Sequence, residues 1–241
     1  MPKKIIGKGL IGKAFENSTA DGDITIFASG ISNSKETNLS LFDRELSLIH
    51  DSINYAPENL FIYFSTCSIL SGEENPYISH KILFEDAIRE KSRRYLIIRL
   101  PQIVGLTTNN TLVSYFVRSI INNTSVNIYN GLLKNLLSVD DVVRLTDEVA
   151  LRSDHFNTSI TFASRYSISP LEIYLKIAKI LNQIPKYQIA SDQIGLIVNA
   201  DIYRTKISSD DVTSAPEYWI NVLKKYVPLI YKKIINEQNF N

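Results

Sequence analysis

The chain has 241 residues, of which 44% are hydrophobic and 21% are charged, so it can form one substantial core, or a main domain with a smaller lobe. Its 26 basic and 25 acidic residues leave a net charge of +1, which gives no support to a nucleic-acid or membrane-surface partner. One cysteine and three scattered histidines exclude a disulfide framework and argue against a metal site.

The first part of the chain alternates short apolar runs with longer amphipathic ones. The predicted elements are a strand over 3–7, a short helix near 10–17, a strand over 23–29, a helix over 38–56, a strand over 60–66, a helix over 77–92 and a strand over 95–100. In the helix over 38–56, the apolar residues recur at three- and four-residue steps: Leu39, Phe42, Leu46, Ile49 and Ile53. Strands that alternate with helices of this length predict a parallel sheet covered on both faces.

After Gly105 the alternation becomes less regular. The predicted elements are a helix over 112–122, strand-like runs at 126–129 and 136–139, a helix over 140–152, a strand near 160–164, a helix from Pro170, and a helical end over 216–238 that Pro228 interrupts. Ser169 is a natural N-cap for the helix that begins with Pro170.

Three glycines follow the first strand in the stretch IIGKGLIGKAF, with the spacing Gly7-x-Gly9-x-x-Gly12. Glycines at this point permit a tight turn and leave helix N–H groups free for a pyrophosphate. A plain glycine-rich turn is the alternative. The position at the first strand–helix junction of an alternating chain favours the dinucleotide site.

Two further stretches carry candidate chemistry. FSTCSIL ends the third strand, so the hydroxyls of Ser65 and Thr66 fall on the edge where parallel sheets bind ligands, although they could also merely cap the strand. We expect Cys67 to be a packing residue. In NPYISHK, Tyr77 and Lys81 are four residues apart and therefore share a helix face, as a proton donor and its electrostatic partner would. Two ordinary helix residues would show the same spacing, so the context decides.

The sequence resembles the extended short-chain dehydrogenase/reductase family, in the branch that acts on nucleotide-activated sugars. The resemblance covers residues 3 to about 215 and rests on six stretches in the family's order: IIGKGLIGKAF, IFASGISNS, FIYFSTCSI, NPYISHK, YLIIRLPQIVG and LLSVDDVVRL. It implies an α/β, Rossmann-like parallel sheet with helices on both faces and a small C-terminal substrate lobe. The implied nucleotide-binding core is 1–105 with 112–165, and the smaller lobe is about 106–111 and 166–241.

The resemblance also implies the roles of individual residues. Thr66, Tyr77 and Lys81 match the catalytic positions. A free phenol has a pKa of about 10, and the Lys81 ammonium and an oxidised nicotinamide would lower it. Tyr77 would then exchange a proton with a substrate oxygen that Thr66 also hydrogen-bonds, while Lys81 would bind the nicotinamide ribose. The implied NADP or NAD contacts are Gly7, Lys8, Gly9, Leu10, Ile11, Gly12, Ala28, Ser29, Gly30, Ser65, Lys81, Pro101 and Ile103. The implied substrate contacts are Lys134 and Asn109.

Three departures from the family pattern stand out. The glycine loop is one residue shorter than the family's. IFASGISNS matches the family's fourth strand, so the family's second and third strands are missing from this chain. The first strand then lies at or near the sheet edge, and no residue matches the family's usual reader of the adenosine ribose. Lys8 could meet a 2′-phosphate there, or could simply be a solvated lysine. Lys134 and Asn135 replace the Arg-Asp pair of many relatives.

The residues after Thr66 narrow the expected reaction. Dehydratases of this branch carry an acidic pair there, whereas this chain has Cys67 and Ser68. We therefore expect an NAD(P)H-dependent ketoreductase that acts on a nucleotide-diphosphate-linked keto-deoxysugar. The alternatives are a nucleotide-sugar epimerase and a non-catalytic nucleotide-binding relative. We expect a cytoplasmic homodimer that pairs through helices 38–56 and 77–92.

Overall fold

The computed structural model describes residues 3–152, 156–191 and 212–239. The chain divides into two compact units, the first comprising residues 1–100 and 139–162 and the second residues 101–138 and 163–241. Residues 192–211 belong to the predicted substrate lobe but lie outside the described residues. Among the described residues, no helix is both long enough and apolar enough to cross a membrane.

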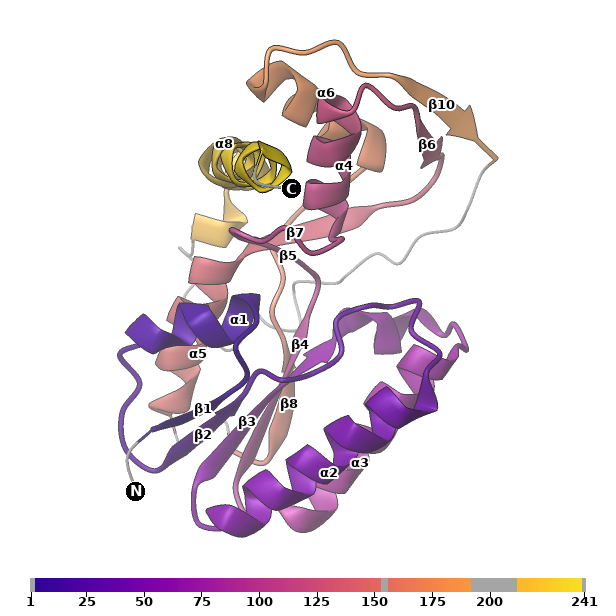
Figure 1. The fold of residues 1–241 in the computed structure, drawn as a ribbon. Helices are drawn as coiled ribbons and strands as arrows, with labels where there is room; N and C mark the ends of the chain where they lie inside the picture. The colour runs from indigo at the N-terminus through magenta and orange to yellow at the C-terminus, as the bar shows by residue number, and fades with distance from the viewer. Residues whose placement is uncertain (1–2, 153–155, 192–211, 240–241) are drawn as a thin grey trace. The chain divides into compact units, whose positions relative to one another are not determined.

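The first unit is built on a five-stranded sheet with the order β1-β2-β3-β4-β8, in which all neighbours are parallel. Its strands are β1 (Lys4–Ile6), β2 (Ile24–Phe27), β3 (Leu60–Thr66), β4 (Tyr95–Leu100) and β8 (Thr158–Thr161). Helices cover both faces of this sheet, α2 (Leu39–Tyr55) and α3 (Pro76–Lys91) on one and α1 (Leu10–Ala14) and α5 (Val139–Ala150) on the other (Figure 1). The Rossmann-like layering predicted from the sequence is confirmed.

The described strands place β1 at one edge of the sheet, beside β2 alone. Only α1, a short 3-10 helix over Phe15–Asn17 and a turn separate these two strands. The predicted loss of two strands and the edge position of the first strand are therefore confirmed. The segment between β1 and β2 is held by Asp147 of α5, which accepts hydrogen bonds from the hydroxyls of Ser18 (2.5 Å) and Thr19 (2.9 Å).

Burial explains why the central segments are strands. All four residues of β2 and the first six of β3 are buried, as expected when helices cover both faces of a parallel sheet. Helix α2 meets the sheet through Phe42, Ile49 and Ile53, but the predicted core residue Leu39 is 62% exposed because it lies in the first turn. The buried face of α2 instead includes the polar residues Glu45 and Ser52.

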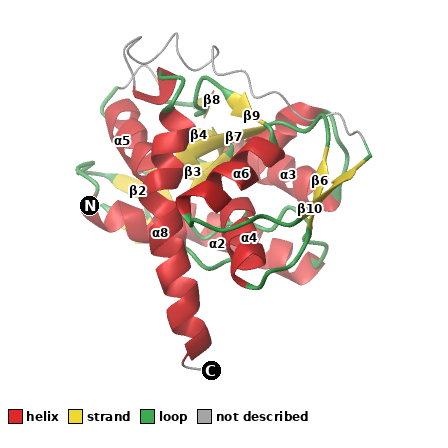
Figure 2. Ribbon diagram, turned by 90° about the horizontal axis from the view of Figure 1, so that it is seen from above, coloured by secondary structure: helices red, strands yellow, loops and turns green. Residues whose placement is uncertain are grey.

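The second unit consists of helices and two small sheets. Its helices are α4 (Leu112–Ile121), α6 (Pro170–Ile180) and α8 (Tyr218–Asn239). Strands β6 (Val126–Tyr129) and β10 (Tyr187–Ala190) pair in parallel and lie side by side in Figure 2. The other sheet is β5-β7-β9, formed by β5 (Gln102–Val104), β7 (Lys134–Ser138) and β9 (Ser167–Ile168).

The division between the units differs from the predicted one. Residues 112–138 were expected in the core, but they belong to the second unit, which is comparable in size to the first. The reason is long-range pairing: β6 pairs with β10, β7 pairs with β9, and the Tyr218 hydroxyl accepts a 2.9 Å hydrogen bond from the backbone N–H of Ser138. Sequence periodicity does not report such partners.

Two helix boundaries test the local predictions. Ser169 caps α6 as predicted, since its hydroxyl accepts from the backbone N–H of Glu172 while the Glu172 carboxylate accepts from the backbone N–H of Ser169. Pro228 was expected to interrupt the C-terminal helix, but α8 continues through it. Burial of Val227 and Ile230 on either side of the proline explains how packing holds the helix together there.

Candidate active site

The candidate catalytic residues meet at the carboxyl edge of the first unit's sheet. Thr66 is the last residue of β3, and Tyr77 lies in the first turn of α3. Asn75 fixes the start of that helix, because its side chain accepts a 2.9 Å hydrogen bond from the backbone N–H of Ile78, and Pro76 occupies the first helical position. Local sequence therefore determines where the Tyr77 side chain is placed.

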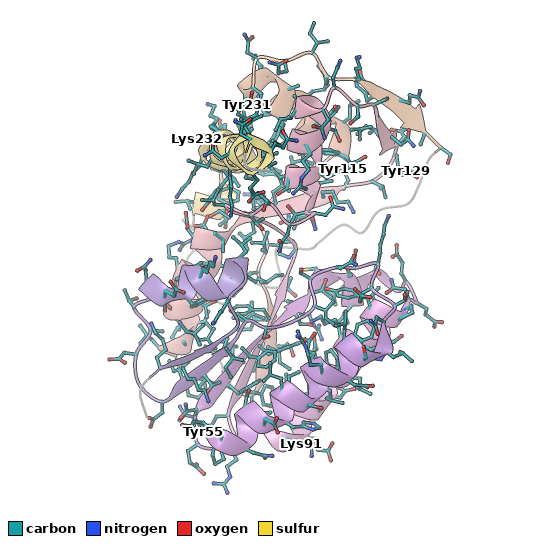
Figure 3. The ribbon with its side chains drawn as sticks, viewed as in Figure 1. Tyr55, Lys91, Tyr115, Tyr129, Tyr231 and Lys232 are labelled. Carbon is teal, nitrogen blue, oxygen red and sulfur yellow. The ribbon has the colours of Figure 1, made fainter. Side chains whose placement is uncertain are left out.

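Helices α2 and α3 both contribute to this site. Their C-terminal ends, marked by Tyr55 and Lys91 in Figure 3, lie at the same end of the unit. Since α3 connects the parallel strands β3 and β4, its N-terminal half lies at the carboxyl edge of the sheet. Tyr77 and Lys81 are both buried, which confirms that they share the face of α3 that packs inward.

Tyr77 is 6% exposed, and its side chain lies near that of Thr66. Burial raises the pKa of Tyr77 to about 12, which the nearby Thr66 side chain opposes and the charge of Glu45 reinforces. The sequence predicted a lowered pKa, on the assumption that the Lys81 ammonium would act on the phenol. In the protein alone that ammonium is paired with Glu45, so Tyr77 stays protonated at neutral pH, as a proton donor must.

Lys81 is buried to 2% exposure, and its Nζ donates hydrogen bonds of 2.9 Å to Glu45 Oε1 and of 2.9 Å to Tyr63 Oη. The Tyr63 hydroxyl in turn donates to the same Glu45 oxygen at 2.8 Å. The pKa of Lys81 is lowered, because burial lowers it by more than the charge and hydrogen bond of Glu45 raise it. Burial and the Glu45 charge both raise the pKa of Tyr63 well above its usual value. The three side chains form one buried polar cluster.

Sequence reasoning missed Glu45 and Tyr63. Glu45 lies three residues after Phe42 and four before Ile49, within the apolar stripe of α2. A carboxylate at a core position is rarely buried without a partner, and this is the signal that could have revealed it. Tyr63 lies in the middle of an apolar strand, where nothing distinguishes its hydroxyl from the neighbouring aromatic rings.

The glycine turn between β1 and α1 has the shape that the motif requires. Gly7 has a φ of +117°, and a Cβ there would lie 2.3 Å from the Ala28 carbonyl oxygen. A Cβ on Gly12 would lie 2.2 Å from the Gly7 carbonyl oxygen, whereas a Cβ on Gly9 would meet nothing within 4 Å. The turn is thus packed tightly against the end of β2 and is open above Gly9. These residues fit the pyrophosphate of a dinucleotide.

The remaining predicted contacts are spread over both units. In the first unit, Lys8 and Gly30 are exposed, and the half-buried residues are Leu10, Ile11, Ala28 and Ser29. Ser65 is buried beside Glu85. The second unit contains Pro101, Ile103, Asn109 and Lys134, of which Asn109 is exposed and the other three are half-buried.

Asn135, which replaces an aspartate of many relatives, has a structural role. Its side chain is buried and pairs with the backbone of Ser164, accepting from the N–H at 3.0 Å and donating to the carbonyl oxygen at 2.8 Å. An amide can donate and accept at once, which a carboxylate cannot. Asn135 therefore fixes the segment that leads into β9.

No protein-family model matches the chain, and a search of curated proteins gives no match. Among solved structures, the dTDP-4-dehydrorhamnose reductase of Clostridium acetobutylicum aligns with a TM-score of 0.74 at 12% identity, over 95% of this chain and 99% of that one. The reductase of Yersinia enterocolitica aligns with a TM-score of 0.67 at 17% identity, over 95% and 100%. The UDP-N-acetylglucosamine 4-epimerase of Methanobrevibacter ruminantium, solved with UDP-N-acetylmuramic acid, aligns with a TM-score of 0.68 at 14% identity, over 89% and 78%.

At these identities the likeness defines the fold. The chain has the Rossmann-like fold of these reductases and this epimerase, and it is shorter than the epimerase. The fold predicted from the resemblance is confirmed.

Proposed function

We propose that this protein is an NAD(P)H-dependent ketoreductase that acts on a keto-deoxysugar linked to a nucleotide diphosphate. The observation that carries the proposal is the Tyr77 hydroxyl, which burial keeps protonated and which lies near Thr66 at the carboxyl edge of the sheet, one helical turn before Lys81. This is the arrangement that a proton donor to a carbonyl oxygen needs.

Each residue has a distinct task in this scheme. Tyr77 donates the proton from its Oη to the substrate oxygen, and Thr66 hydrogen-bonds the same oxygen. The glycine turn over Gly7–Gly12 and the segment Ala28–Gly30 would hold the dinucleotide, with Lys81 near its nicotinamide ribose. When bound, the reduced nicotinamide supplies the hydride for the carbonyl carbon. Either NADH or NADPH suits these residues, because no residue of the chain matches the family's usual reader of the adenosine ribose.

Two features favour reduction over the other reactions of the same fold. Cys67 and Ser68 follow Thr66, so the acid that dehydration would require is missing at that position. The chain also aligns with essentially the whole length of two dTDP-4-dehydrorhamnose reductases, but with only 73% to 79% of several epimerases and a dehydratase. Nucleotide-sugar epimerisation is the second candidate.

The test is to incubate the purified protein with NADH or NADPH and a panel of nucleotide-linked 4-keto-6-deoxyhexoses, following the loss of reduced nicotinamide absorbance. We expect substrate-dependent oxidation of the cofactor. Conversion of a nucleotide sugar to its epimer without net oxidation would point to the second candidate. Cofactor binding with no turnover of any sugar would instead indicate a non-catalytic relative.

A dimer through α2 and α3 is proposed separately. Of the apolar residues of α3, Ile78, Phe84 and Ile88 are buried within the unit, which leaves Ile82 (42% exposed) and Leu83 (49% exposed) as the apolar surface. Substituting both with lysine should yield monomers if this surface pairs. If light scattering shows that the unsubstituted protein is a monomer at micromolar concentration, the proposal is contradicted.

A further inference from the structure

Glu45 joins three separate elements around Lys81. One carboxylate oxygen accepts from Lys81 of α3 at 2.9 Å and from the Tyr63 hydroxyl of β3 at 2.8 Å. The other oxygen accepts a 2.7 Å hydrogen bond from the backbone N–H of Ile31, in the loop that follows β2. The residues just before Ile31 are those to which the proposed function assigns cofactor contacts. One buried carboxylate therefore connects that loop with the catalytic lysine.

The loop lies directly on this ion pair. A Cβ on Gly30 would lie 2.9 Å from Glu45 Oε1 and 3.0 Å from Lys81 Nζ. A side chain at position 30 would therefore displace the Glu45 carboxylate or the Lys81 ammonium group. The position of the loop and the position of the ammonium group are consequently fixed by the same contacts.

We propose that Glu45 is the positioning residue of this site: its carboxylate holds the ammonium group of Lys81 in place, favours its charged form and ties the loop over residues 28–31 to it. The catalytic consequence rests on the proposed function, whereas the effect on Lys81 itself does not.

The physical reason is the burial of the lysine. A buried ammonium without a partner loses its proton readily, because desolvation disfavours the charged form. The titratable groups that face Lys81 are Glu45 from α2, Tyr63 from β3, and Tyr77 and Glu85 from α3.

Of these, the Glu85 carboxylate is already engaged by Arg99, with contacts of 2.9 and 2.7 Å, and by Arg89 at 2.6 Å. Both tyrosines remain neutral at physiological pH because burial raises the pKa of each. Among the described residues, Glu45 is therefore the carboxylate that contacts the Lys81 ammonium group directly.

The experiment compares Glu45→Gln with a matched control, Asp43→Asn. Both variants remove one negative charge from α2, but Asp43 is exposed. The first readout is the pH titration of the Lys81 side chain by ¹³C NMR in the cofactor-free protein, with the signal assigned through Lys81→Arg. The second is the pH profile of kcat and KM with NADPH and the keto-sugar that the panel identifies.

We expect Lys81 to have the same pKa in the parent and in Asp43→Asn, because Asp43 is exposed. In Glu45→Gln the pKa of Lys81 should be lower than in the parent, because burial would then act without the opposing charge of Glu45. The kcat of Glu45→Gln should then fall about tenfold per pH unit above the Lys81 pKa measured by NMR, and should recover on the acidic side. A merely structural role would lower kcat equally at every pH.

The outcomes separate the two proposals. A Lys81 pKa in Glu45→Gln that equals the pKa in the parent overturns the positioning role, whatever the enzymatic activity. The predicted titration in a protein that reduces no sugar upholds the role of Glu45 and removes the proposed function.

If Glu45→Gln does not fold, Glu45→Asp takes its place, since it keeps the charge and withdraws the carboxylate by one methylene. Glu45→Asp should lower kcat by about 10- to 100-fold, because the ammonium group is displaced. Combining Glu45→Asp with Lys81→Arg should not restore the activity that Lys81→Arg loses. A kcat of Glu45→Asp equal to that of the parent would overturn the proposal.

Discussion

The role of Tyr77 can be tested by removing a single oxygen atom. Tyr77→Phe keeps the ring, which is 6% exposed and packs in the core of the first unit, and deletes only the hydroxyl. The loss of this polar group should lower the free energy of unfolding by at most about 1.5 kcal/mol. The loss of the proton donor should lower kcat by about 10² to 10⁴, equivalent to about 2.7 to 5.4 kcal/mol in the activation barrier.

The assay is steady-state reduction of the keto-sugar, together with urea unfolding and calorimetric titration of the cofactor. Tyr174→Phe is the matched control, because Tyr174 is also buried and its hydroxyl donates one 3.2 Å hydrogen bond, to the carbonyl oxygen of Lys186. Both variants should lose similar stability, but only Tyr77→Phe should lose turnover while still binding the cofactor. A kcat for Tyr77→Phe within about threefold of the parent would refute the assignment.

Three other predictions follow from the first unit. Cys67 is 2% exposed, and burial raises its pKa to about 12, so the native protein should react with a thiol reagent far more slowly than the urea-unfolded protein; equal rates would contradict this. The pKa of Glu85 is lowered, because the hydrogen bonds from Arg99 outweigh the effect of burial, which raises it. The Glu85–Arg99 pair therefore stabilises the fold when the pH is above the pKa of an unfolded glutamate, about 4.3. That stability should be lost as the pH falls below this value, and Glu85→Gln should show a shallower acid dependence in urea unfolding than the parent; equal slopes would count against the pair. Because β1 lies at the sheet edge and no residue matches the family's reader of the adenosine ribose, the dissociation constants of NADH and NADPH should differ by less than about tenfold, or about 1.4 kcal/mol. A calorimetric preference beyond about a hundredfold would reveal an unrecognised ribose reader.

Local patterns were sufficient to predict much of the first unit. The strands over 60–66 and 95–100 have the predicted bounds, because buried parallel strands appear as continuous apolar runs closed by a turn or a proline. The helix that carries Tyr77 and Lys81 was predicted over 77–92 and spans Pro76–Lys91. The edge position of β1 was implied by the resemblance, in which the second strand of this chain matches the family's fourth strand.

The parts that were missed depend on contacts distant in sequence. Strand β10 was not predicted because its residues are mostly exposed and it pairs with β6, about sixty positions earlier along the chain. Glu45 was overlooked because its partner Lys81 lies on a different helix, and a carboxylate within an apolar stripe looks from the sequence like a break in the pattern. The lowered pKa of Tyr77 was predicted for a site that also holds an oxidised nicotinamide; in the protein alone, burial raises this pKa and the charge of Glu45 adds to the effect.

The central claim is that this protein transfers a hydride to a sugar carbonyl. The most direct measurement follows deuterium from NADH or NADPH labelled at nicotinamide C4 into the product, by mass spectrometry and NMR, with the substrate that the panel identifies. A ketoreductase should place one deuterium on the former carbonyl carbon for each cofactor oxidised, and Tyr77→Phe should abolish the transfer. A product without deuterium at that carbon, formed with no net oxidation of the cofactor, would contradict the account.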